Sequence, residues 1–262
     1  MSAQPPADNL GSLSLLANNS DCRRQTARHV ATLWQEHWPR STRVVDFGAG
    51  DGGLLSEILD YMPTRPHASL IEPDQHSASE AVARLVDKTT SVAIVDGLES
   101  LDSLDVCLAA HVLYYVPDLE SWLNAVISRM AQEATLTVVL TDLSCPMYAL
   151  RGIVRSATGR RPRITMARLL DGCTAHGLTP SISRVESTFA YEVFSPVISE
   201  IPADSDDPSL GRLICWLTGL DPTSQLEPTL LGPINEFLLE HYHKRWIRWE
   251  MRDSVIHMRR SS

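Results

Sequence analysis

The sequence predicts an α/β fold in which helices cover both faces of one doubly wound, mostly parallel sheet. Short apolar segments typical of buried strands alternate with segments whose apolar residues recur at helical spacing. A glycine-rich turn follows the first of these strands and opens a helix. The 262 residues are 44% hydrophobic, which is enough for one sizeable core. We therefore expect a single domain over residues 20–262, after a flexible N-terminus at 1–19.

The first half of the chain shows this alternation most clearly. An amphipathic helix is expected from Ser20 to Trp38, with Ser20 or Asp21 as its cap and Pro39 as its stop. Ser77 is expected to cap a later helix, because Glu80 follows it at capping-box spacing. That helix covers 77–86, further helices are expected at 54–62 and 118–130, and strands at 43–47, 67–72, 91–95, 104–110 and 134–140.

The second half is less regular but supplies the two strands that complete a seven-stranded sheet. The arginine-rich segment 151–163 is expected to be a solvated loop. Residues 195–246 are expected to form a small helical insertion that covers the ligand pocket before the last strand. A helix that ends before Gly177 is expected at 165–176, strands at 182–194 and 249–259, and helices of the insertion at 210–220 and 234–246.

The net charge and the cysteine content indicate which partners are unfavourable and which cellular compartment is expected. The formal net charge of −9 makes nucleic acid or an anionic membrane an unfavourable partner. Five cysteines without a C-x-x-C pair are typical of free thiols in a reducing compartment. We see neither a signal peptide nor an apolar run of about 20 residues, so a cytoplasmic location is expected.

The glycine turn is the strongest functional motif. Gly48, Gly50 and Gly53 follow a buried strand at the spacing G-x-G-x-x-G, and the helix that begins there offers free N–H groups to a ligand. Glu72 lies 24 residues after Gly48, at the end of the second strand. A carboxylate at that place can bind both hydroxyls of a ribose, although it could also be a plain surface acid. These residues alone do not distinguish a nicotinamide dinucleotide from S-adenosylmethionine.

Asp46 favours the second of these ligands. It stands two residues before the first glycine, where a carboxylate would repel a pyrophosphate but attract a cationic sulfonium and ammonium. The alternative is an acid that orders the loop. The segment from Val44 to Gly53 resembles motif I of class I methyltransferases, which have a Rossmann-like fold and use S-adenosylmethionine.

This resemblance implies a set of cofactor-binding residues. Asp96, at the end of the third strand, would face the adenine amino group, although a turn acid before Gly97 is an equal alternative. The complete expected set is Asp46, Gly48, Ala49, Gly50, Glu72, Pro73, Asp96, Gly97 and Ala110.

A second motif follows the fourth strand. The segment His111-Val-Leu-Tyr-Tyr-Val-Pro-Asp118, together with Ile71-Glu-Pro73 and Arg163-Ile-Thr165, is similar to histamine N-methyltransferase-like small-molecule methyltransferases over about residues 20–180. The resemblance implies that the substrate lies against His111 and Tyr115. A member of this family carries Gln in place of His111, which leaves the amine substrate open. Asp21 is a weak candidate for the family's N-terminal substrate acid.

From these motifs we expect His111 and Tyr115 to be catalytic, and His111, Tyr114, Tyr115 and Trp246 to contact the substrate. Each has a structural alternative: a buried, satisfied histidine, one tyrosine in the core, and a core tryptophan. No metal site is expected, because His241 and His243 would point apart on a helix. Oligomeric state and acceptor are not encoded in any motif.

The predicted function is in-line transfer of a methyl group from S-adenosylmethionine to a nitrogen, or an oxygen, of a small molecule. Two alternatives remain open at this point. One is a nicotinamide-dependent oxidoreductase, and the other is a non-catalytic protein with a methyltransferase-like fold.

Overall fold

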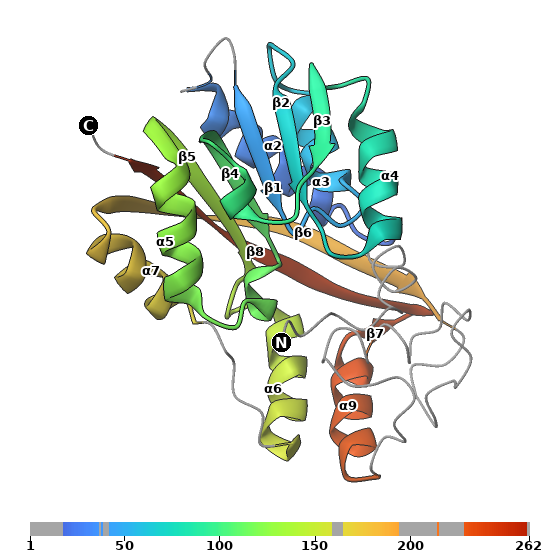
Figure 1. Ribbon diagram of the computed structural model, residues 1–262. Coiled ribbons are helices and arrows are strands. Elements are labelled where there is room, and N and C mark those ends of the chain that lie inside the picture. The colour runs from blue at the N-terminus through green and yellow to red at the C-terminus, as the bar shows by residue number, and fades with distance from the viewer. Residues whose placement is uncertain are drawn as a thin grey trace.

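A computed structural model describes residues 18–36, 38, 42–158, 165–193, 214 and 228–260. One sheet of eight strands, with helices packed on both of its faces, forms the centre of the molecule (Figure 1). The strand order is β3-β2-β1-β4-β5-β8-β6, and β7 pairs with β8 outside this path. The Rossmann-like, mostly parallel fold predicted from the sequence is therefore confirmed.

Five neighbouring strands are parallel to one another, whereas β8 runs antiparallel to both β5 and β6. The chain winds outward from β1 in one direction to β2 and β3, and in the other to β4 and β5. Ligands of such sheets bind where the winding reverses, at the carboxyl ends of the central strands. The bounds are β1 Arg43–Phe47, β2 His67–Ile71, β3 Ser91–Ile94, β4 Leu104–Ala110, β5 Met130–Thr141, β6 Leu178–Glu192, β7 Tyr242–His243 and β8 Trp246–Arg260.

Alternating side chains of the strands form two cores, one on each face of the sheet. Val44, Val106 and Leu108 pack under α2 (Cys22–Gln35), α3 (Gly53–Leu59) and α4 (Gln75–Leu85). Their neighbours Val45 and Cys107 face the other way, toward α5 (Leu119–Arg129) and α7 (Met166–Ala175). Burial on both faces explains why these strands are mostly apolar in sequence and do not alternate with polar residues.

A third core lies where β6 and β8 extend past the other strands. The remaining helices α6 (Pro146–Thr158) and α9 (Pro228–Glu240) cover this extension, and we call the assembly the second lobe (Figure 1). Phe189 of β6 and Trp249 of β8 stack there with their ring centroids 4.4 Å apart. The lobe thus has apolar packing of its own, built on the extended ends of β6 and β8.

Several expected boundaries need correction. Asp74, and not Ser77, caps α4, because its side chain accepts the backbone N–H of Ser77. The expected loop at 151–163 is wrong over 151–158, which belong to α6. The expected helix at 234–246 ends at Glu240, and the chain turns there through β7 into β8. The expected helix at 210–220, the first 17 residues and most of the insertion at 195–246 lie outside the described residues.

Candidate functional site

The glycine turn has the backbone geometry that its sequence demands. Gly48 and Gly50 have φ angles of 74° and 54°, in the left-handed region that favours glycine. A Cβ on Gly48 would lie 2.2 Å from Cγ2 of Val112, so glycine is also required for the close approach of the loop after β4. A Cβ on Gly50 would meet nothing within 4 Å. The turn therefore presents its backbone at Gly50 to open space, where a ligand can approach it.

Glu72 joins the end of β2 to this turn. Its Oε2 accepts the backbone N–H of Gly50 at 2.9 Å, and its Oε1 accepts that of Asp74 at 3.0 Å. Each carboxylate oxygen has a second lone pair, so both can still accept from the two hydroxyls of a ribose. The side chain is thus fixed in place beside the backbone that would hold a nucleoside.

Asp46 lies beneath the turn and is 3% exposed. Burial, Glu72 and Asp51 raise the pKa of its carboxyl to about 7. The charge of Asp51 is balanced by ion pairs with Arg23 and Arg84, whose nitrogens lie 3.5 and 3.1 Å from its Oδ2. The negative potential around Asp46 would be relieved by a bound cation and worsened by a pyrophosphate. The negative charge of these carboxyl groups therefore fits the cationic S-adenosylmethionine.

The loop after β4 brings the second motif to the same edge of the sheet. His111 has a φ of 55°, and its backbone N–H donates to the carbonyl of Val139 at 2.9 Å. The turn directs the chain into a 3-10 helix, η2 (Leu113–Tyr115). The periodicity of apolar residues in the sequence did not predict this short helix. Beyond the turn, Nε2 of His111 lies 3.4 Å from Oδ2 of Asp253 on β8.

The two tyrosines of η2 have different environments. The hydroxyl oxygen of Tyr114 accepts the backbone N–H of Thr141 at 2.7 Å, which anchors η2 to the end of β5. Arg151 of α6 lies over the Tyr114 ring, 5.4 Å from its centroid. Tyr115 is 42% exposed, and burial of its hydroxyl raises its pKa although Arg151 opposes the shift. Tyr115 is therefore the tyrosine that a ligand could reach.

The other predicted cofactor residues lie around this centre. Ala49 is part of the turn and Ala110 ends β4, both half-buried. Pro73 is exposed beside Glu72, and Asp96 is exposed after the end of β3. Gly97 has an extended backbone, with φ at −180°, that any residue can adopt.

Two predicted residues are not part of this group. Trp246 opens β8, seven residues before Asp253, which corresponds to about 23 Å along an extended strand. Its ring lies instead under Arg248, with 5.3 Å between the centroid and Cζ. Asp21 precedes α2 and accepts the backbone N–H of Thr188 at 2.8 Å, so it ties α2 to β6.

The structure adds two acids that sequence analysis missed, Asp142 after β5 and Asp253 on β8. Asp142 accepts from Ser144 and Ser254 and pairs with Arg184 at 3.0 Å; these contacts outweigh its burial and hold its pKa well below the ordinary value. Asp253 is 2% exposed. Its sequence signal is weak, because Asp253 is one of two carboxylates in this segment, and only the structure shows that Glu250 is exposed while Asp253 is buried.

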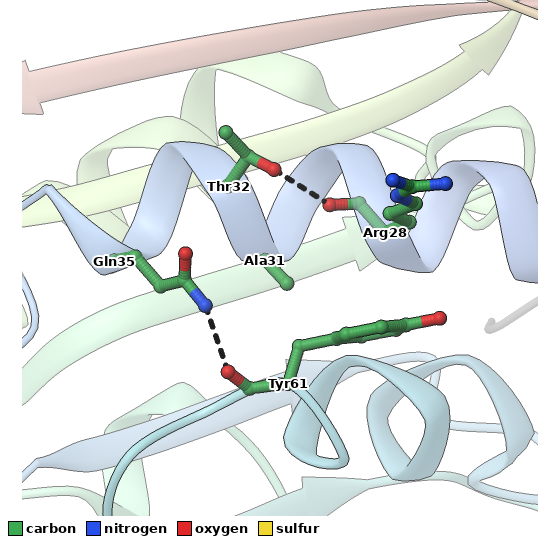
Figure 2. A pocket seen from close by; sticks show the side chains of 5 residues that line it. All are labelled: Arg28, Ala31, Thr32, Gln35 and Tyr61. Atoms are coloured by element: carbon green, nitrogen blue, oxygen red, sulfur yellow. Dashed lines mark hydrogen bonds between the residues drawn. The ribbon is translucent and has the colours of Figure 1, made fainter.

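A separate groove of about 400 Å³ lies between α2 and the turn that follows α3 (Figure 2). Gln35 closes one part of it, since its side-chain amide donates to the carbonyl of Tyr61 at 2.8 Å. Tyr61 follows the C-terminal end of α3, whereas the glycine turn precedes the N-terminal end of that helix. The groove contains none of the predicted site residues; it is lined by Arg28, Ala31, Thr32, Gln35 and Tyr61.

The described part of the chain shows neither a metal cluster nor a membrane-spanning helix. Within the described ranges, no group of three or more His, Cys, Asp or Glu side chains is placed to hold a metal ion. Among the helices of the same ranges, none is long and apolar enough to cross a membrane.

Solved structures with the same fold include methyltransferases. The YcgJ protein from Bacillus subtilis is 13% identical, with a TM-score of 0.55, over 90% of this chain and 99% of that one. A putative methyltransferase from Bacillus halodurans is 10% identical, with a TM-score of 0.56, over 91% and 99% of the two chains. At these identities the likeness concerns the fold alone.

No curated protein matches the sequence at a significant level. A family model does match it: the methyltransferase domain aligns with residues 19–167, more than half of the chain. This range contains the glycine turn, Glu72 and the loop with His111, and the match decides between the two cofactors that the glycines left open. The chain belongs to the methyltransferase domain family, and it is an S-adenosylmethionine-dependent methyltransferase.

Proposed function

We propose that the acceptor is a small molecule that is methylated on a nitrogen or an oxygen, as in the histamine N-methyltransferase-like enzymes that the sequence resembles. The observation that carries this proposal is the pair of accessible side chains beside the glycine turn. His111 offers a base and Tyr115 a hydroxyl at the carboxyl edge of β4. Both side chains lie in the short segment that follows β4, so they can act on the same small acceptor.

The cofactor supplies a methyl group that its positive sulfur already activates. Glu72 would hold the ribose, the backbone at Gly48 and Gly50 would lie along the nucleoside, and Asp46 would face the cationic end. When bound, the cofactor would supply this methyl group to a lone pair of the acceptor, with S-adenosylhomocysteine as the leaving group. The acceptor's proton passes to His111, directly or through water.

The chain's own residues contribute mainly alignment. Holding the acceptor atom in line with the methyl group is worth up to roughly 7–11 kcal/mol of the barrier. Tyr115 would orient the acceptor by a hydrogen bond from its hydroxyl. The negative charge of the chain and the carboxylates at the site disfavour nucleic acid and anionic membranes as partners. A cytoplasmic location stays a prediction.

Transfer from methyl-tritiated S-adenosylmethionine into a fractionated extract tests the acceptor class. We expect the label in the low-molecular-weight fraction, with mass spectrometry assigning the methyl group to nitrogen or oxygen. His111→Ala should lower transfer by about 10²–10⁴-fold, the usual contribution of general-base catalysis, while cofactor affinity stays within a factor of two or so. Label confined to protein or nucleic acid would contradict the proposal.

A further inference from the structure

His111 reaches across the sheet to a buried acid that no motif pointed to. Its Nε2 lies 3.4 Å from Oδ2 of Asp253, although 142 residues separate the two in the chain. His111 is the first residue after β4, while Asp253 lies on β8, opposite Thr141 of β5. The histidine side chain is 42% exposed and the aspartate side chain 2%. One partner of the pair is thus open to a ligand, and the other is enclosed.

Asp253 is held by donors from a different element. Its Oδ2 also accepts from the Sγ of Cys22 and from the Oγ1 of Thr26, each at 3.2 Å, both on α2. Burial alone would raise the pKa of Asp253, but His111 and these two donors together lower it below the ordinary value. An ionised carboxylate therefore lies at a fixed position behind the imidazole.

The neighbouring acid Asp142 shows what a purely structural carboxylate looks like in this sheet. Its charge is paired with Arg184, and Ser144 and Ser254 fill its remaining positions. Asp253 differs because, among the residues that the structure describes, its ion-pair partner is a histidine at the carboxyl edge. A partner that can gain and lose a proton is what a base needs, and a permanently charged arginine cannot provide it.

We propose that Asp253 is a positioning residue that holds the His111 imidazole with its proton on Nε2, so that Nδ1 carries the lone pair that takes a proton from the acceptor. This rests on the proposed function. In the step, the X–H bond of the acceptor breaks, its proton forms a bond to Nδ1, and Asp253 remains ionised beside the imidazolium. Within the described residues Nδ1 has no hydrogen-bond partner of its own, so it is available to an acceptor.

The other titratable and charged groups around the pair come from α2, η2, α6 and the turn before α6. Cys22 of α2 is protonated, because burial and Asp253 raise its pKa well above the ordinary value. Tyr114 of η2 is protonated as well, since burial raises its pKa, and Arg151 of α6 lies over its ring. Cys145, before α6, also has a pKa raised by burial. None of these competes with Asp253 for the imidazole proton.

The test is the imidazole tautomer, read from ¹⁵N chemical shifts of the full chain at pH 8, with His111 assigned by the signal lost in His111→Gln. We expect the Nε2–H tautomer in the wild type. Asp253→Asn should mix or reverse the tautomers, because its amide can donate as well as accept. Thr26→Val is the matched control, since it removes one donor to Asp253 without touching His111, and it should keep the wild-type tautomer.

An Nδ1–H tautomer in the wild type would overturn the proposal, even if Asp253→Asn failed to fold. An unchanged tautomer in Asp253→Asn would overturn it as well. With a methyl acceptor in hand, Asp253→Asn should lower kcat at least about 100-fold with an unchanged KM, and Asp253→Glu should restore part of the loss. Calorimetric titration of the same samples with S-adenosylmethionine tests the proposed function separately. If the cofactor failed to bind while the Nε2–H tautomer stayed fixed, the proposed function would be contradicted, but the pairing of His111 with Asp253 would stand.

Discussion

Asp46 has a protonation equilibrium that differs between the folded and the unfolded chain. Its pKa rises from 3.8 to about 7 on folding, because the carboxyl is buried near Glu72 and Asp51. Between these two values the folded state binds the extra proton, so the free energy of unfolding falls as the pH rises from about 4 to about 7. The residue is thus a cost to the empty protein, and a bound cation would offset that cost.

Asp46→Asn should therefore stabilise the chain at pH 8 while weakening its cofactor affinity. A shift of three pKa units corresponds to at most about 4 kcal/mol, and the gain should vanish near pH 4. Urea unfolding at pH 4, 6 and 8 measures this difference, with Asp96→Asn as the control for an exposed acid at a strand end. A gain in stability that did not depend on pH would contradict this account of Asp46.

At the scale of elements, the second lobe depends on side chains that pack across the paired strands β6 and β8. Trp249→Ala should lower the free energy of unfolding by about 3–5 kcal/mol, because Trp249 is 4% exposed and stacks on Phe189. Trp246→Ala, three residues earlier on the same strand and only half-buried, should cost below about 1 kcal/mol. Urea unfolding followed by circular dichroism compares the two, and equal losses would contradict the packing described for this pair of strands.

The helix α6 shows why part of the fold escaped prediction. Met147, Leu150 and Val154 are spaced i, i+3 and i+7 and are buried in the second lobe. Arg151 and Arg155 stand on the same helix and suggested a solvated loop, yet they lie over the rings of Tyr114 and Tyr148. Arginine on an aromatic face is a long-range arrangement, which a local count of charges cannot distinguish from solvation.

The parallel half of the sheet was predictable for the opposite reason. Strands such as 43–47 and 104–110 are mostly apolar and bounded by turns, so local pattern alone gives their bounds. The glycine turn and Glu72 were found in the same way, from residue type and spacing. Asp253 was not, because its meaning depends on β8 lying beside β5 and facing a loop more than a hundred residues away.

At the scale of the whole molecule, the winding of the sheet assembles the site. Asp46, Glu72 and His111 come from the ends of β1, β2 and β4, three neighbouring strands that all point toward the same edge. The antiparallel β8 then adds Asp253 from the far end of the chain. The second lobe lies beyond this edge (Figure 1). Its helix α6 contacts the site where Arg151 lies over the ring of Tyr114 in η2.

The most direct test of the central claim is calorimetric titration of S-adenosylmethionine into the wild type and into Gly50→Ala. We predict one cofactor per wild-type chain, no binding of a nicotinamide dinucleotide, and at least a tenfold loss of affinity in Gly50→Ala, whose methyl group would occupy the open space above the turn. The left-handed φ of 54° should cost this variant only about 1–2 kcal/mol of stability, so it should remain folded. Binding of the dinucleotide instead, or full cofactor affinity in a folded Gly50→Ala variant, would contradict the claim that this turn holds S-adenosylmethionine.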